Sequence, residues 1–261
     1  MRKTILDIPI DWIAIDELKR KLELFVVSRK PHQITTVNPE FIVLSHDNKE
    51  YQKVLRGSDL SLADGTGIII AQAYFDRARA KSGLMRLMTY LTLGLQFLFL
   101  PHSFSYRRIT GVYLGELLMA MSAEQTWRVF LLGAAKGVAA EAAEIWRQRY
   151  PGLIIAGTSA ANPQDKETIT AVKAAKPDIL LVAYGPPKQD TFIAVHRNDI
   201  SVPIMVGVGG IFDTLTGRKY NPPGWIKALG LEWLAYLIVH PRRLKRIWRA
   251  TVGFSLLVLK G

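Results

Sequence analysis

Apolar and polar positions alternate along the second half of the chain as they do in open α/β sheets. Apolar runs within residues 127–132, 178–183 and 203–208 are typical of strands buried on both faces, and helical spacing follows the first two. Shorter β-branched or apolar runs at 33–38 and 60–63 give the first half the same rhythm. The pattern predicts an α/β fold with an open, mainly parallel, Rossmann-like sheet and helices on both faces.

One helical segment is more apolar than this scheme requires. Residues 84–100 contain a single charged residue, Arg86, and are followed by Pro101. They number about 17, fewer than the roughly 20 needed to cross a bilayer. Because basic residues flank them, we predict an apolar insertion at about 77–107 whose helix lies in a membrane interface or forms a re-entrant hairpin. The alternative is an ordinary helix buried in the core.

Residues 221–261 are predicted to form a helical appendage to an α/β domain that covers residues 1–220. Pro222 and Pro223 mark the boundary, and the stretch 242–249 carries five basic residues before an apolar tail at 252–259. Basic side chains, a tryptophan and an apolar end together are typical of a peripheral membrane element. The alternative is a solvated basic helix packed on the sheet domain.

Polar residues follow two of the predicted strands. Thr36 and Asn38 end one strand, and Asp64 follows the next within Ala63-Asp64-Gly65-Thr66-Gly67. Ligands bind at the carboxyl edge of open parallel sheets. We therefore expect these side chains to share one site, although Asp64 alone also suits a helix cap.

Three further strand exits are rich in glycine: Gly133 to Gly137, residues 185–190 with Lys188 and Gln189, and residues 207–213, which end at Asp213. The helix start after Gly133 can hold a phosphate, Lys188 can pair with one, and Gln189 can hydrogen-bond a base or a sugar. Taken singly, each exit can equally be a tight turn or a helix start. Their convergence on one sheet edge favours a binding site.

The net charge of +12 and a pI near 9.9 favour polyanionic partners, namely nucleic acid, anionic lipid or phosphorylated substrates. The chain has no cysteine and no Asp-X-Asp pair, and its five histidines lie apart, so we predict no metal site and no cofactor. A Gly-X-Ser-X-Gly elbow is also missing, which disfavours an α/β-hydrolase.

Several motifs occur in one order over nearly the whole chain. They include Thr36-Val37-Asn38-Pro39-Glu40, Ala63-Asp64-Gly65-Thr66-Gly67, Arg108-Ile109-Thr110-Gly111, Gly185-Pro186-Pro187-Lys188-Gln189-Asp190, Gly207-Val208-Gly209-Gly210-Ile211-Phe212-Asp213 with Gly217-Arg218, and Gly230-Leu231-Glu232-Trp233 with Pro241-Arg242-Arg243. In this series the chain resembles the WecG/TagA/CpsF family of bacterial glycosyltransferases.

The resemblance implies transfer of a sugar, N-acetylmannosamine or a related hexose, from a UDP-sugar donor to a polyprenyl-diphosphate-linked acceptor in cell-surface polysaccharide or teichoic acid synthesis. It implies inversion without a metal, by a peripheral or monotopic enzyme at the cytoplasmic face of the cell membrane. It also implies Asp64 as the general base, with Thr36 and Asn38 beside it. The predicted substrate-binding residues are Arg108, Gly133, Gly137, Lys188, Gln189, Asp213, Arg218, Arg242, Arg243 and Arg246. The C-terminal arginines among them would hold the acceptor diphosphate.

The chain departs from the family pattern around the implied base. Val112 and Tyr113 stand where an acid usually follows Thr-Gly, residues 221–223 replace Arg-Ala-Pro, and Ala235-Tyr236 occupies the place of a second arginine-bearing turn. These departures bear on which donor and which acceptor are used.

Two other functional classes share some of these features. A nicotinamide-dependent oxidoreductase would use the same sheet edge, but it should show a third fingerprint glycine and a ribose-binding acid, which we do not find. A nucleic-acid-binding protein would explain the charge, yet the basic residues lie beside apolar tails rather than between exposed aromatic residues. We therefore predict an anionic membrane surface as a partner and no nucleic acid. The sequence leaves a homo-oligomer open.

Overall fold

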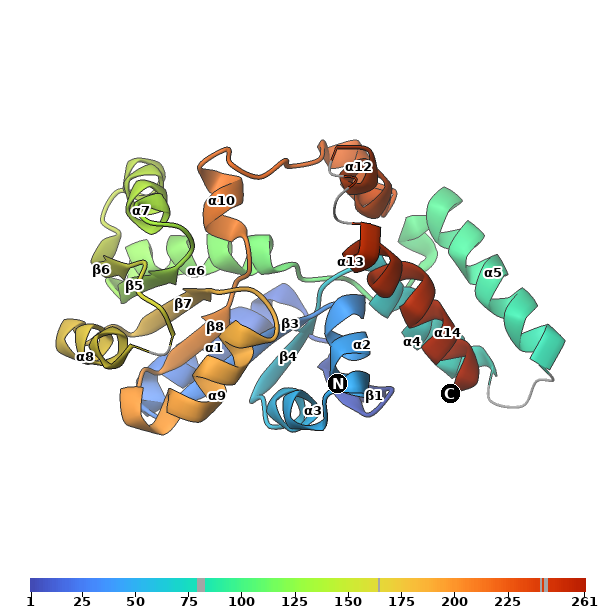
Figure 1. Cartoon of the computed structure of the whole chain (residues 1–261), viewed down its shortest axis with the longest axis horizontal. Coiled ribbons are helices and arrows are strands. Elements are labelled where there is room, and N and C mark those ends of the chain that lie inside the picture. Colours follow the sequence, from blue (N-terminus) through green and yellow to red (C-terminus); the bar gives the residue numbers. More distant parts are fainter. Residues whose placement is uncertain (79–82, 164, 240, 242–243) are drawn as a thin grey trace.

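The computed structural model describes residues 1–78, 83–163, 165–239, 241 and 244–261. Within these residues, eight strands form one open sheet in the order β1-β2-β4-β3-β8-β7-β5-β6 (Figure 1). β1 (Arg2–Ile5) and β2 (Ile8–Asp11) pair antiparallel at one edge, and the other neighbouring strands pair parallel. The predicted open, mainly parallel sheet is therefore confirmed.

The parallel strands follow the apolar runs of the sequence. They are β3 (His32–Val37), β4 (Leu60–Ala63), β5 (Arg128–Gly133), β6 (Ile154–Ser159), β7 (Ile179–Ala183) and β8 (Ile204–Gly207). Every residue of β4, β7 and β8 is buried, as expected of strands covered on both faces. β6 lies at the open edge of the sheet and is more exposed.

Helices cover both faces of the sheet, as the alternation of strands and helices predicts. One layer consists of α1 (Ile15–Ser28), α6 (Gly111–Gln125), α7 (Val138–Arg149) and α10 (Ile211–Leu215). The opposite layer consists of α2 (Pro39–Asp47), α3 (Lys49–Arg56), α8 (Lys166–Ala175) and α9 (Lys188–Ile200). The largest side chain in the first layer, Trp146, is fully buried and packs edge-on against Phe212.

The C-terminal appendage packs against helices that follow the first half of the sheet. It comprises α11 (Gly224–Ala228), α12 (Glu232–Val239), α13 (Leu244–Trp248), a π-helical turn (Arg249–Gly253) and α14 (Phe254–Lys260). Figure 1 shows α14 beside α4 (Thr66–Ala78) and α5 (Gly83–Phe99). Phe254 and Val258 are buried in the same core cluster as Tyr74 and Phe97. The predicted apolar tail is therefore partly internal rather than wholly available to a membrane.

α5 is the helix of the predicted apolar insertion, and a 3-10 turn (Pro101–Ser103) follows it. Its inner side chains Leu93 and Phe97 are buried, but most of its other large apolar side chains are exposed. The alternative of an ordinary core helix is therefore wrong. None of the helices among the described residues is both long and apolar enough to cross a bilayer.

Candidate active site

Five adjacent strands deliver the predicted site residues to one edge of the sheet. In spatial order, β4 ends before Asp64, β3 ends before Asn38, and β8, β7 and β5 end in the three glycine-rich turns. These strands are mutually parallel, so their carboxyl ends lie on the same side. The edge also contains a point where the connections of neighbouring strands run in opposite directions, since the chain leaves β7 towards β8 and leaves β5 towards β6. Open α/β sheets bind ligands at such points.

Asp64 follows β4, at one end of this row of five strands, and is half-buried. Its backbone N–H donates to the Val37 carbonyl (2.8 Å), and its Oδ2 accepts from the Gly111 N–H (3.3 Å) at the start of α6. Burial raises the pKa of Asp64 to about 6, against the opposing effects of the Gly111 N–H and the charge of Arg108. The carboxylate thus bonds to α6, rather than acting as a cap of α4 as the structural alternative expected.

Thr36 and Asn38 flank Asp64 but differ in their contacts. A Cβ added to Gly111 would lie 3.2 Å from the Thr36 Oγ1 and 3.9 Å from the Asp64 Oδ2, so glycine allows α6 to begin close to both. The Asn38 Oδ1 caps α2 by accepting from the N–H groups of Glu40 (2.9 Å) and Phe41 (3.2 Å). Asn38 therefore has a structural task that the sequence analysis did not assign to it.

Arg108 joins the site to the C-terminal appendage. Its Nη1 pairs with the Glu232 Oε1 at 2.6 Å, and its Nη2 donates to the Lys227 carbonyl. The Arg108 charge lowers the pKa of Asp64 and the Glu232 charge raises it. Arg108 is thus near Asp64, as predicted. Glu232 was missed as a site residue, although its motif was noted, because its partner is 124 positions away in the chain.

Gln189 is buried between two glycine-rich turns. Its Oε1 accepts from the N–H groups of Gly185 (3.1 Å) and Gly209 (2.9 Å). A Cβ on Gly207 would lie 2.5 Å from the Gln189 Nε2, so that position needs glycine. Gln189 holds the two turns together, and its neighbour Lys188 is exposed at the first residue of α9.

Asp213 and Lys219 lie after β8, on α10 and in the following loop. The Asp213 carboxylate is half-buried and forms no hydrogen bond or ion pair with the residues that the structure describes. The Lys219 Nζ lies 3.3 Å from the place of a Cβ on Gly210 and 5.5 Å from the ring centre of Tyr236. Its charge lowers the pKa of Asp64. Lys219 is not among the substrate-binding residues predicted from the sequence, although its neighbour Arg218 is.

The remaining basic residues of the predicted site either form ion pairs or lie outside the residues that the structure describes. Arg218 pairs with Glu141 of α7 (2.6 Å) and is half-exposed. The Arg246 Nε pairs with the buried Glu40 (2.7 Å), which ties α13 to the start of α2. Arg242 and Arg243 lie outside the described residues.

The turn after β5 has the backbone that its glycines predict. Gly133 has a φ of +101° and Gly137 a φ of +85°, in the left-handed region that favours glycine. A Cβ on Gly133 would lie 3.0 Å from the backbone of Ala183, so this turn also packs closely on the end of β7.

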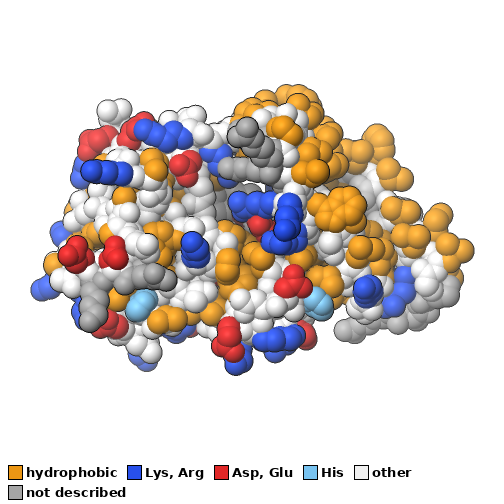
Figure 2. Space-filling view, in the orientation of Figure 1, with side chains coloured by type: hydrophobic (Ala, Val, Ile, Leu, Met, Phe, Trp, Pro, Cys, Tyr) orange, Lys and Arg blue, Asp and Glu red, His pale blue; other side chains and the backbone are white. Residues whose placement is uncertain are grey.

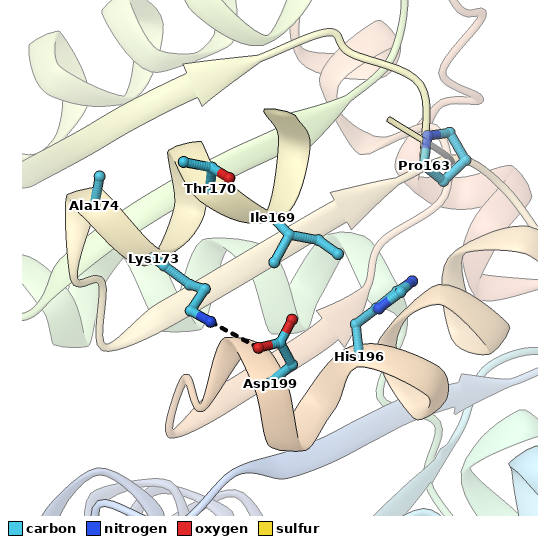
Figure 3. A pocket seen from close by; sticks show the side chains of 7 residues that line it. All are labelled: Pro163, Ile169, Thr170, Lys173, Ala174, His196 and Asp199. Carbon is cyan, nitrogen blue, oxygen red and sulfur yellow. Dashed lines mark hydrogen bonds and ion pairs between the residues drawn. The ribbon is translucent and has the colours of Figure 1, made fainter. Parts of the chain in front are cut away.

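Two other features of the described residues concern metal ions and cavities. Among the described residues, no group of three or more His, Asp or Glu side chains is placed to hold a metal ion. A hollow of about 840 Å³ lies between α8 and α9 (Figure 3). Its lining residues are Pro163, Ile169, Thr170, Lys173, Ala174, His196 and Asp199. None of the predicted site residues lines this hollow. Two of its charged side chains pair with each other, with 2.6 Å between the Lys173 Nζ and the Asp199 Oδ1.

A comparison of the sequence with known protein families identifies one family. The profile of the glycosyl transferase WecG/TagA/CpsF family matches residues 3–91 and 89–261. The chain belongs to this family. It is therefore a glycosyltransferase, and the nicotinamide-dependent oxidoreductase and nucleic-acid-binding alternatives are set aside.

Two relatives of the chain carry the same name. An N-acetylglucosaminyldiphosphoundecaprenol N-acetyl-beta-D-mannosaminyltransferase of Bacillus subtilis is 30% identical over 228 residues, which cover 87% of this chain and 78% of the relative. A protein of the same name from Staphylococcus aureus is 25% identical over 246 residues, which cover 93% of this chain and 87% of the relative.

Proposed function

We propose that this glycosyltransferase moves N-acetylmannosamine or a related hexose from a UDP-sugar to a polyprenyl-diphosphate-linked sugar, with inversion, in the synthesis of a cell-envelope polymer. The observation that carries the proposal is Asp64: a carboxylate at the carboxyl edge of the sheet, half-buried, with its pKa raised to about 6. A general base works best when its pKa lies near the operating pH. The names of the relatives support the donor and acceptor classes.

In the proposed reaction, Asp64 takes the proton of an acceptor hydroxyl. The hydroxyl oxygen forms a bond to the anomeric carbon while the bond from that carbon to the UDP β-phosphate oxygen breaks, and the electron pair leaves with UDP. One displacement inverts the anomeric centre, so a single carboxylate suffices. Because the Gly111 N–H holds Oδ2, the Oδ1 atom is the one that faces the acceptor in this scheme.

The leaving diphosphate gains negative charge, which nearby cations and amides must stabilise. Lys219 is the side chain that we assign to this task, since it lies over Gly210 at the exit of β8 and acts electrostatically on Asp64. Lys188 and the N–H groups of the turn after Gly133 are further donors at the same edge. Arg108 would contribute its positive charge near Asp64 rather than a direct hydrogen bond to the diphosphate, because its guanidinium already binds Glu232 and the Lys227 carbonyl.

The acceptor would reach the site from the side of the C-terminal appendage. Arg246 is half-exposed although its Nε pairs with Glu40, so other nitrogens of its guanidinium remain available for an acceptor phosphate. Arg242 and Arg243 are proposed to act with it. We propose that the enzyme acts at the cytoplasmic face of the membrane in peripheral contact, and the lipid-linked acceptor in the names of the relatives supports membrane association.

The test is a UDP-release assay. The purified chain is given a panel of UDP-sugars, with and without a short-chain lipid-diphosphate-sugar acceptor, and the anomeric configuration of the product is determined by NMR. We expect acceptor-dependent UDP release and an inverted product. UDP release that ignores the acceptor, or a product that retains the donor configuration, would reject the proposal.

A further inference from the structure

The outer face of α5 is an exposed apolar stripe. Leu84, Met88, Leu91, Leu95 and Phe99 follow one another at intervals of four, three, four and four residues, so they share one side of the helix. Their exposed fractions are 73%, 58%, 53%, 59% and 74%. Soluble surfaces expose single apolar residues, but a continuous stripe of this length marks an interaction surface.

The apolar surface continues over the C-terminal appendage. Figure 2 shows hydrophobic side chains gathered over α12 and towards α5 on the face in view. Ile238 of α12 is 73% exposed, Trp225 of α11 is 65% exposed, and Trp248 of α13 is 59% exposed. Tryptophan is enriched where proteins meet the headgroup region of a bilayer. We use the name docking face for these three residues together with the stripe of α5.

The charges around the docking face identify its partner. Residues 77–107 and 233–261, which supply nearly all of it, contain no Asp or Glu, whereas Lys and Arg are frequent in both. A second copy of this chain would bring two basic surfaces together. An anionic bilayer instead matches both the positive charge and the exposed apolar side chains of this face. Its headgroups attract Lys and Arg, and its acyl chains cover the Leu, Met and Phe side chains.

We propose that α5 is an interfacial membrane helix, which lies in the surface of an anionic bilayer and forms one docking face with the appendage. The inference deepens the proposed function, since the lipid-linked acceptor is embedded in that bilayer. α5 falls short of a membrane span, so it lies along the surface.

The placement of α5 connects membrane docking to the base. Asp64 precedes α4 by two residues, and its Oδ2 bonds to the first residue of α6. α5 lies between these two helices in the sequence and packs against α4. A bilayer bound by α5 would therefore act on Asp64 through the packing of α5 on α4 and through residues 100–110, which lead to α6. This favours a fixed distance between the proposed base and the lipid surface.

The first test measures partition onto vesicles. The full chain and a Leu84→Gln, Met88→Gln, Leu91→Gln variant are sedimented with phosphatidylcholine vesicles that contain or lack phosphatidylglycerol. We expect the variant to lose at least about tenfold in partition onto the anionic vesicles, since binding scales with buried apolar area. A Leu24→Gln, Val27→Gln variant is the matched control, because these side chains are 66% and 77% exposed on α1, away from the docking face.

The second test uses the absence of cysteine from the chain. Leu91→Cys and, as the control, Leu24→Cys are labelled with an environment-sensitive fluorophore. On anionic vesicles we expect a blue shift at position 91 and none at position 24. Equal spectra at the two positions, unchanged partition of the triple variant, or self-association in place of vesicle binding would overturn the proposal.

A turnover ratio separates this inference from the proposed function. The ratio of turnover on a long-chain acceptor in vesicles to turnover on a water-soluble short-chain acceptor should fall about tenfold in the triple variant. If neither acceptor is used by any form of the chain, the proposed function fails, while the partition and fluorescence results still decide the role of α5. Melting temperatures of all variants verify that they are folded.

Discussion

Asp64→Asn should make the protein more stable at neutral and alkaline pH while it removes activity. The pKa of Asp64 is raised from 3.8 to about 6 by burial, so the folded state binds the proton of this carboxyl more tightly than the unfolded state does. As the pH rises from about 4 to about 6, ionisation therefore favours unfolding, and above about pH 6 the full destabilisation is present. Asparagine carries no charge at any of these pH values.

The size of the effect follows from the same two pKa values. A change from 3.8 to about 6 corresponds to about 3 kcal/mol of unfolding free energy. Asp64 is only half-buried, and solvent screens part of this energy. We therefore expect Asp64→Asn to gain about 1–3 kcal/mol at pH 8 relative to the wild-type chain, and little or nothing at pH 4.

The assay is urea unfolding of both proteins at a series of pH values between 4 and 8. Only the difference between the two free energies is analysed, so that the titration of all other groups cancels. Asp47→Asn, at the exposed end of α2, controls for the substitution itself. A difference between Asp64→Asn and the wild type that does not change with pH would refute the reasoning about the environment of Asp64.

The activity of the same variant tests the role of the carboxylate. As a general base, Asp64 should contribute at least roughly a hundredfold to turnover. The wild-type kcat/KM should also fall as the pH drops below about 6, because the protonated carboxyl cannot accept a proton. Near-normal turnover in Asp64→Asn would remove Asp64 from this role.

Three further predictions concern Lys219, Gln189 and the C-terminal segment 241–261. Lys219→Met should lower kcat about tenfold or more and move the acidic limb of the pH profile to higher pH, because the Lys219 charge lowers the pKa of Asp64; Lys219→Arg should restore most of both, and an unmoved limb would contradict the assignment. Gln189→Leu should cost about 2–3 kcal/mol of unfolding free energy in urea, since the N–H groups of Gly185 and Gly209 lose their acceptor; an unchanged midpoint would show that water replaces it. Deletion of residues 241–261 should lower the melting temperature as well as membrane binding, because it removes the buried Phe254 and Val258; a deletion that releases the protein from membranes without loss of stability would contradict this packing.

The parallel sheet and the convergence of its polar and glycine-rich strand exits on one edge were predictable because they depend on local signals. β7 and β8 are short apolar runs bounded by glycine or proline, and runs of this kind are strands buried between two helical layers. Once the sheet is parallel, geometry alone brings Asp64, Asn38 and the glycine-rich turns to one edge. No long-range information is needed for that step.

Contacts between distant residues were not predictable in this way. Arg108 and Glu232 are 124 positions apart, and neither carries a local sign of its partner. Gln189 follows a strand exit, where a polar side chain can face a ligand or turn inward. Its burial and its hydrogen bonds to the Gly185 and Gly209 N–H groups show that it turns inward. Sequence patterns place such residues at the site but do not show which of their atoms are already hydrogen-bonded.

The apolar segments of the chain show why composition cannot separate a core from a membrane surface. Residues 84–100 and the apolar tail at 252–259 have similar apolar content, yet the tail contributes Phe254 to the core while Leu84 and Phe99 of α5 remain exposed. Burial of the tail against α4 and α5 fixes α5 in place. The tail therefore supports the docking face from within, and the exposed stripe of α5, together with Trp248, is left to meet the lipid. In the proposed docking arrangement the appendage would thus have two roles: it packs against the helices next to Asp64, and it would present the surface from which the acceptor arrives.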